Sequence, residues 1–219
     1  GISHTFEAGK TNLIIGKSGA GKTVMLKILV GLFPPSSGSI FYDDTDFIGL
    51  DKKQLRDLRM KVGMLFQGSA LFDSMTVEEN VRFPLDMFTA QTKKEKDDRV
   101  NYCLDRVGLN NANKKYPSEI SGGMQKRVGI ARSIVLNPTY LFCDEPNSGL
   151  DPKTALVIDE LIKDITVENN ITTVINTHDM NSVMEIGDNI ALLHLGELAW
   201  SGTKDEVLDS DNDILQDFI

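Results

Sequence analysis

"GKSGAGKT", residues Gly16 to Thr23, decides the fold of this chain, because it matches the pattern G-x-x-x-x-G-K-[ST] at every fixed position. The apolar, β-branched run "TNLIIG" (residues 11–16) precedes it, and the helical run "KTVMLKILVGL" (residues 22–32) follows. The glycines permit a loop whose backbone N–H groups turn toward an anion at the start of a helix. The stretch therefore predicts a strand, a phosphate-binding loop and a helix in succession.

Every residue of this loop is a candidate nucleotide contact. In such a loop, the ammonium of Lys22 reaches the β- and γ-phosphates and the hydroxyl of Thr23 ligates Mg²⁺, so Lys22 is also a candidate catalytic residue. A glycine turn that merely precedes a helix is the alternative, and the strand and helix on either side argue against it. The candidate contacts are Gly16, Lys17, Ser18, Gly19, Ala20, Gly21, Lys22 and Thr23.

Outward from the loop, strand-like and helical segments alternate, which is typical of an α/β fold with a mostly parallel sheet. Between Thr76 and Leu136 the pattern is helical only, and "TVEE" at residues 76–79 is typical of a capping box. We therefore predict a core built from residues 1–67 and 138–219, with a short C-terminal extension, and an inserted α-helical subdomain at residues 68–137. The expected strands are residues 11–16, 37–44, 61–66, 139–145, 171–179 and 188–195.

Composition limits the possible partners and compartments. The 219 residues are 41% hydrophobic, enough for one substantial core, and the net charge of −9 argues against a nucleic-acid partner. No apolar run reaches the roughly 18–20 residues that span a bilayer, so we expect any membrane role to depend on a partner. Cys103 and Cys143 lie in apolar stretches, and we expect both to be reduced core residues. His4 and His194 are expected to be structural or exposed.

The run "YLFCDEP" (residues 140–146) ends an apolar strand with two adjacent acids. Successive strand side chains point to opposite faces, but at the carboxyl end of a strand both can flank a ligand. We expect Asp144 to hold Mg²⁺ through water and Glu145 to act as the general base on an attacking water. An ordinary acidic strand end is the alternative, and the nearby phosphate loop disfavours it.

Gln67 and His178 follow other predicted strands, where an open α/β sheet gathers its ligands. A glutamine can bind Mg²⁺ or orient water, and a histidine can donate a hydrogen bond to a γ-phosphate. Either residue alone would more often be structural. Their common position after strands makes both candidate catalytic residues.

A second glycine-containing helix start occurs at "ISGGMQKR", residues 120–127. Ser121 is a good N-cap, and Gly122 and Gly123 leave the helix start sterically open. A plain cap is the alternative. Because Gly16–Thr23 already supplies one set of N–H donors, a second anion-binding start is redundant unless it serves the nucleotide of another copy.

In their order along the chain, these motifs resemble those of the ATP-binding cassette ATPases, and the resemblance covers nearly the whole sequence. It implies a P-loop NTPase (RecA-like) core, ATP and Mg²⁺ as cofactors, and ATP hydrolysis coupled to transmembrane transport. The matching segments are Gly16–Thr23 (Walker A), Gln67 (Q-loop), Ile120–Met124 (signature), Asp144–Glu145 (Walker B), Ser148–Asp151 (D-loop) and His178 (H-loop).

The resemblance also implies a head-to-tail homodimer that sandwiches two ATP molecules, each between the Walker A loop of one chain and the signature of the other. Ile120 and Met124 stand where the family prefers leucine and glutamine, and Asn147 stands where threonine is common. The aromatic that stacks on adenine in this family lies upstream of this chain, which we expect to be a shortened form of the cassette. By this resemblance, the residues that contact nucleotide from the partner side are Ser121, Gly122, Gly123, Met124 and Asp151.

Three longer segments, residues 66–81, 121–132 and 177–203, resemble the Mla/Mce-type phospholipid-transport ATPases of bacteria. This finer resemblance implies a multi-spanning permease and an Mce-type lipid-binding subunit as partners, and a peripheral location on the cytoplasmic face of the inner membrane. An importer ATPase for another cargo, a non-transport cassette and a signalling cassette remain open. Leu71, Phe72 and Met75 fit either a permease-binding groove or the core of the helical segment.

Overall fold

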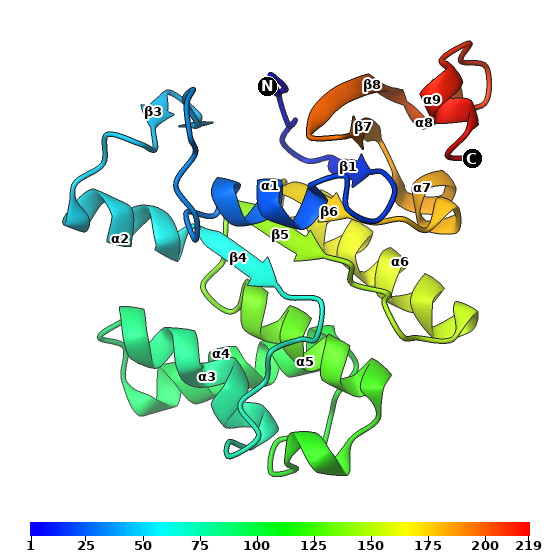
Figure 1. Ribbon diagram of the computed structural model, residues 1–219. Helices are drawn as coiled ribbons and strands as arrows, with labels where there is room; N and C mark the ends of the chain where they lie inside the picture. Colours follow the sequence, from blue (N-terminus) through cyan, green and yellow to red (C-terminus); the bar gives the residue numbers. More distant parts are fainter.

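A six-stranded sheet forms the centre of the computed structural model, which describes residues 1–219 (Figure 1). All neighbouring strands are parallel except the last pair, β7 and β8, which are antiparallel. This arrangement confirms the predicted α/β class with a mostly parallel sheet. In spatial order the strands are β4 (Val62–Leu65), β5 (Tyr140–Asp144), β6 (Thr172–Asn176), β1 (Thr11–Ile15), β7 (Asn189–His194) and β8 (Glu197–Thr203).

Helices cover both faces of the sheet, because successive side chains of each buried strand point in opposite directions. Ile14 packs in one cluster with Leu26, whereas Leu13 packs in another with Ile158. These contacts place α1 and α6 on opposite faces. The helices are α1 (Lys22–Leu29), α2 (Lys52–Met60), α3 (Val77–Phe88), α4 (Lys93–Arg106), the 3₁₀ turn η1 (Pro117–Glu119), α5 (Gly122–Ile134), α6 (Pro152–Glu168), α7 (Met180–Ile186), α8 (Lys204–Val207) and α9 (Asp213–Gln216).

Side-chain caps explain where several helices begin, and they confirm the N-caps predicted at Thr76 and Ser121. Thr76 and Glu79 form the expected capping box at α3: the Thr76 N–H donates to Glu79 Oε2 over 2.7 Å, and the Glu79 N–H donates to Thr76 Oγ1 over 3.4 Å. The carboxylates of Asp51 and Asp151 cap α2 and α6, and the Ser121 hydroxyl caps α5. Each cap accepts from N–H groups that have no partner within the helix.

The prediction of a strand over residues 37–44 was wrong in extent. Only β2 (Phe41–Tyr42) and β3 (Thr45–Asp46) form there, as a small hairpin outside the main sheet. Asp43, with φ of 51°, turns the chain after two residues, and aspartate tolerates this left-handed conformation better than most residues. Tyr42 packs edge-on against Tyr140, with ring centroids 4.7 Å apart, so the hairpin is held against the start of β5.

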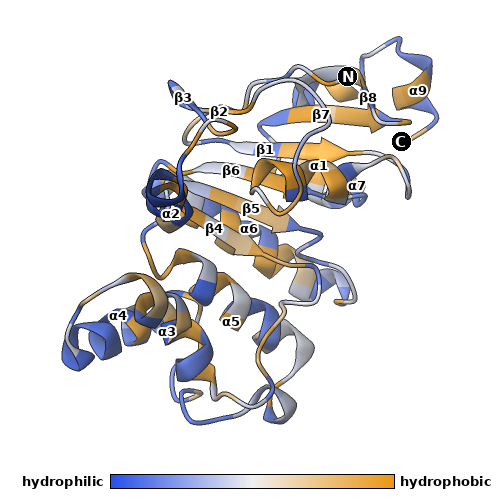
Figure 2. Ribbon diagram, turned by 60° about the vertical axis from the view of Figure 1, so that its left-hand side comes forward, coloured by the Kyte–Doolittle hydropathy of each residue, from blue (hydrophilic) through white to orange (hydrophobic).

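Helices α3, α4 and α5 lie together below β4 in Figure 1 and share a continuous core with the sheet. Figure 2 shows apolar colouring along β1 and β7 and polar colouring over α2. Of the apolar segment after Gln67, Leu71 packs against the core, whereas Phe72 is 41% exposed and its ring contacts that of Phe83 at a tilt of 52°. Leu71 thus agrees with the core interpretation, and the permease-binding groove stays a prediction.

Two further properties bear on the sequence predictions. Cys103 and Cys143 are both buried free thiols, as predicted. No helix combines the length and the apolar character that crossing a membrane requires.

Candidate functional site

The loop between β1 and α1 curls around the side chain of Lys22. Gly16 has φ of 148°, and a Cβ atom there would lie 2.4 Å from the carbonyl oxygen of Leu193, so only glycine fits. Lys22 Nζ donates to the carbonyl oxygen of Gly16 over 2.7 Å, which holds the ammonium inside the loop. The loop has the local geometry that the sequence predicts for phosphate binding.

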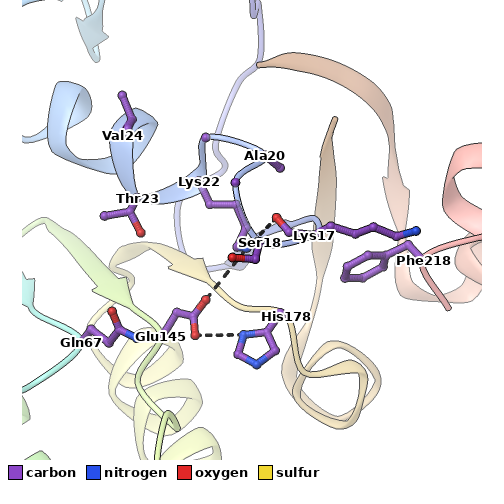
Figure 3. A pocket seen from close by; sticks show the side chains of 12 residues that line it. Lys17, Ser18, Ala20, Lys22, Thr23, Val24, Gln67, Glu145, His178 and Phe218 are labelled. Carbon is purple, nitrogen blue, oxygen red and sulfur yellow. Dashed lines mark hydrogen bonds and ion pairs between the residues drawn. The ribbon is translucent and has the colours of Figure 1, made fainter. Parts of the chain in front are cut away.

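A cavity of about 730 Å³ opens in front of this loop (Figure 3). Gln67, Glu145 and His178, which come from three separate segments of the chain, lie at the same cavity as the loop. The structure therefore brings together the candidates that follow different strands. The lining residues are Lys17, Ser18, Gly19, Ala20, Gly21, Lys22, Thr23, Val24, Gln67, Glu145, His178 and Phe218.

Glu145 lies between Lys22 and His178, as the dashed lines of Figure 3 indicate. Its Oε2 lies 2.9 Å from His178 Nδ1, and its Oε1 lies 3.9 Å from Lys22 Nζ. Burial lowers the pKa of Lys22, while the charges of Glu145 and Asp144 act in the opposite direction. Glu145 has φ of 47°, a left-handed conformation that directs the chain sharply away from β5. The carboxylate is thus fixed in orientation at the cavity wall.

Thr23, which lines the cavity, contacts the buried carboxylate of Asp144, and the two side chains supply oxygen atoms suited to Mg²⁺. Thr23 Oγ1 donates to Asp144 Oδ1 over 3.0 Å, and Asn176 Nδ2 donates to the same oxygen over 3.2 Å. No group of three or more His, Cys, Asp or Glu side chains forms a metal cage. Mg²⁺ is commonly held by one or two protein oxygens together with substrate phosphates, so this pair fits the ion.

Gln67 is exposed, and its Nε2 donates to Ser148 Oγ over 3.4 Å. Its backbone is held by Lys126, whose buried Nζ donates to the carbonyl oxygen of Gln67 and, over 3.4 Å, to that of Glu145. Lys126 therefore ties α5 to two segments that line the cavity.

Sequence reasoning missed Lys126, although a signal for it exists. Residues 126, 130 and 134 are four apart on one helix face, and Lys126 is the polar member of that face beside Ile130 and Ile134. It also missed Phe218, which lines the cavity, and Asp217, which forms an ion pair with Lys17. No local pattern in the sequence connects the C-terminal segment with the loop 200 residues before it.

The signature residues form a separate group away from the cavity. Ser121 and Gly122 are exposed at the start of α5, and Ser121 Oγ accepts from the N–H of Met124 over 3.3 Å. A Cβ atom on Gly123 would lie 2.8 Å from Thr154 Cγ2, so α5 begins directly against the first turn of α6.

Asp151 belongs to this second group, because its Oδ2 accepts from Thr154 Oγ1 over 2.6 Å. This hydrogen bond, with a second from the Thr154 N–H, lowers the pKa of the Asp151 carboxyl. Within one chain, the two sets of predicted nucleotide contacts therefore face different places: Ser121, Gly122, Gly123, Met124 and Asp151 are absent from the cavity lining.

Comparison with known proteins identifies relatives along the whole chain. Residues 1–148 match the family model described as ABC transporter. The probable ribonucleotide transport ATP-binding protein mkl of Mycobacterium tuberculosis is 41% identical over 218 residues, which is 100% of this chain and 61% of that protein. The methionine import ATP-binding protein MetN of Corynebacterium diphtheriae is 40% identical over 94% of this chain and 61% of its own length. The chain thus spans about three fifths of the length of these curated relatives.

Solved structures give the same family. The dimeric structure of the ATP-binding cassette MJ0796 bound to ADP and Pi has a TM-score of 0.84 and 33% identity, covering 93% of this chain and 89% of that one. CbiO1 of Clostridium perfringens, part of the transporter complex cbiONQ, has a TM-score of 0.87 and 31% identity, covering 97% and 84%. In its fold, its ordered motifs and the residues that match the family model, the chain belongs to the ABC transporter family.

Proposed function

We propose that this chain is the ATP-hydrolysing, nucleotide-binding subunit of an ABC transporter. The observation that carries the proposal is the position of Glu145, whose carboxylate lies between His178 and Lys22 at the wall of the phosphate-loop cavity. A carboxylate held beside a phosphate site can accept a proton from a water molecule that attacks the γ-phosphate.

The other cavity residues fit the remaining requirements of phosphoryl transfer to water. The loop N–H groups and Lys22 bind the phosphate oxygens, and His178 both orients Glu145 and donates to the γ-phosphate. Thr23 and Asp144 hold Mg²⁺, which neutralises charge on the phosphates when bound. Gln67 borders the same space and orients water or ligates the ion.

Two copies of the chain complete each site in this proposal. The exposed helix start at Ser121 and Gly122, together with Asp151, lies outside the cavity of its own chain and is available to a second molecule. The dimeric structure of MJ0796 with ADP and Pi, a protein 33% identical to this one, supports such a pairing. We assign Ser121 and Gly122 to an α-helical subdomain at residues 68–137, inserted between core segments 1–67 and 138–219, and Asp151 to the second of these core segments.

For the cargo, we propose phospholipid, moved between bacterial membranes through a multi-spanning permease with an Mce-type lipid-binding subunit. The chain would then be peripheral to the cytoplasmic face of the inner membrane. The support is the resemblance of residues 66–81, 121–132 and 177–203 to the phospholipid-transport ATPases. The names of the relatives, which refer to ribonucleotide and methionine transport, provide the competing cargoes.

One purification tests both levels of the proposal. The full-length protein is isolated with its co-encoded membrane partner, bound small molecules are identified by mass spectrometry, and phosphate release from ATP is measured with Mg²⁺. Phospholipid that co-purifies and stimulates hydrolysis supports the cargo, whereas bound methionine or ribonucleotide contradicts it. A complex that binds ATP but releases no phosphate contradicts the proposed activity.

A further inference from the structure

A buried carboxylate on α6 connects two of the loops that form the cavity. Asp159 is 2% exposed, and none of the ion pairs in the structure includes it. Its Oδ1 accepts from Asn147 Nδ2 over 2.7 Å, and the same Nδ2 donates to Ser182 Oγ over 3.0 Å. Asn147 Oδ1 is buried without a hydrogen-bond partner, so the amide is held by its nitrogen alone.

The partners of Asp159 belong to the segments that carry Glu145 and His178. Asn147 lies two residues after Glu145, in the loop that leaves β5. Ser182 lies four residues after His178, in the first turn of α7. The two segments are therefore joined twice, once at the cavity through the 2.9 Å contact between Glu145 and His178, and once in the interior through the amide of Asn147.

Keeping a carboxylate at this position has an energetic cost. Burial raises the pKa of Asp159, and the nearby Asp179 and Glu185 act in the same direction, while the hydrogen bonds from Ser182 and Asn147 oppose them. A buried carboxylate without a cationic partner is costly unless hydrogen bonds compensate for the water that it loses. What the carboxylate supplies and an apolar group cannot is a fixed acceptor that orients the Asn147 amide.

We propose that Asp159 is a positioning residue for ATP hydrolysis: through Asn147 and Ser182 it sets the separation of the two loops and so holds the Glu145 carboxylate against His178. This inference rests on the proposed ATPase function. Asp159 lies outside the cavity lining, so it acts on the rate of the chemical step and not on nucleotide affinity.

The test compares turnover and nucleotide affinity in the full-length protein. Asp159→Leu, which removes both acceptor oxygens and keeps the branched shape of the side chain, is expected to lower kcat about tenfold while the Kd for ATP changes less than about twofold. Asp159→Asn keeps one acceptor for Asn147 and is expected to restore part of the rate. Ser182→Ala removes the second partner and is expected to lower kcat in the same sense.

Thr166→Val is the matched control on the same helix. Thr166 is fully buried, about two turns beyond Asp159, and hydrogen-bonds to Thr173 and to the carbonyl oxygen of Ile162. Its substitution removes a buried hydrogen bond of the same helix without reaching either loop. We expect a lower melting temperature and an unchanged kcat per folded molecule.

A second measurement separates positioning from general damage. In a His178→Ala background, Asp159→Leu should add little to the loss in single-turnover rate, because the contact between Glu145 and His178 that Asp159 supports is already absent. A fully additive loss, or an unchanged kcat in both Asp159→Leu and Ser182→Ala, overturns the inference. If Asp159→Leu does not fold, Ser182→Ala carries the same comparison.

A wild-type protein that binds ATP without hydrolysing it contradicts the proposed function itself, whereas active wild type with equally active variants contradicts only the role of Asp159.

Discussion

His178 Nδ1 lies 2.9 Å from Glu145 Oε2, although the two residues follow different strands. The sheet explains the contact: β5 and β6 are parallel neighbours with Asp144 paired to Asn176, so both strands end at the same edge. One residue beyond β5 and two beyond β6, the chain places the carboxylate and the imidazole side by side. The candidate catalytic pair is thus a consequence of strand register.

Glu145→Gln tests the role of this carboxylate as general base. The amide has nearly the same shape but cannot accept the proton of the attacking water, so we expect turnover to fall by ~10² or more. Because the phosphate loop and Lys22 are unchanged, ATP affinity should remain close to that of the wild type. Phosphate release and equilibrium nucleotide binding, measured on the same preparation, check both expectations, and near-normal turnover would remove Glu145 from this role.

Lys126→Met tests whether the buried ammonium on α5 maintains the cavity. Its Nζ donates to the backbone oxygens of Gln67 and Glu145, so the substitution leaves two acceptors near the cavity without this donor. Lys126 does not line the cavity, and we therefore expect kcat to fall about tenfold with ATP affinity retained. Steady-state kinetics of ATP hydrolysis, with the Kd for ATP measured separately, provide the test.

Lys163→Met is the control for this change. Lys163 also donates to a backbone carbonyl, that of Glu185, but it does so on an exposed surface of the protein. We expect turnover to stay unchanged and the free energy of unfolding to move by no more than about 0.5 kcal/mol. Equal losses of kcat in the two variants would count against a specific role for Lys126.

The sequence predicted those parts of the molecule that short-range chemistry specifies. The phosphate loop, the capping box at Thr76 and the candidate residues at strand ends follow from patterns a few residues long. The parallel sheet then brings the phosphate loop and the strand-end residues together at the carboxyl ends of its strands. β8 was missed because "ELAWSGT" has no clear alternation of apolar and polar residues. This strand forms by pairing with β7 at the edge of the sheet, which the local sequence does not reveal. Residues 37–44 were misjudged because two consecutive aspartates favour a turn over a strand.

The contacts between distant segments were beyond the reach of local patterns. Asp159 reads as an ordinary polar residue of an amphipathic helix until the fold places Asn147 and Ser182 against it. The spacing of residues 126, 130 and 134 places Lys126 on an apolar helix face, but its acceptors, the carbonyl oxygens of Gln67 and Glu145, are known only from the fold. The role of such groups depends on the tertiary structure that buries them.

The two cysteines provide a test of the core. Burial raises the pKa of Cys103 to about 11 and raises that of Cys143 as well, and the thiolate is the reactive form. Between pH 7 and 9 both groups therefore stay protonated in the folded chain, and we expect almost no reaction with a water-soluble disulfide reagent. In denaturant two thiols per chain should react, and Cys103→Ser should leave one. Rapid reaction of the native protein would contradict the packing of both segments.

Ser121→Arg and Lys22→Ala together test whether each site is shared between two chains. Arginine at the exposed start of α5 should block the approach of a partner's nucleotide while leaving the variant's own phosphate loop able to bind ATP. Lys22→Ala should weaken phosphate binding in its own loop. Neither homodimer should turn over. In a mixed dimer, one site then contains both defects and the other contains neither, so we expect part of the activity to return on mixing.

The return of activity discriminates sharply, because no arrangement with both halves of the site in one chain can produce it. Ser201→Arg, at an exposed position of β8, is the control for adding an arginine to the surface and should leave turnover unchanged. If mixing restores nothing, cysteines replacing Ser18 in one chain and Asp151 in the other decide the reason. A cross-linked but inactive mixed dimer means that the two sites depend on each other, whereas failure of both assays contradicts the head-to-tail pairing on which the second nucleotide-contacting surface depends.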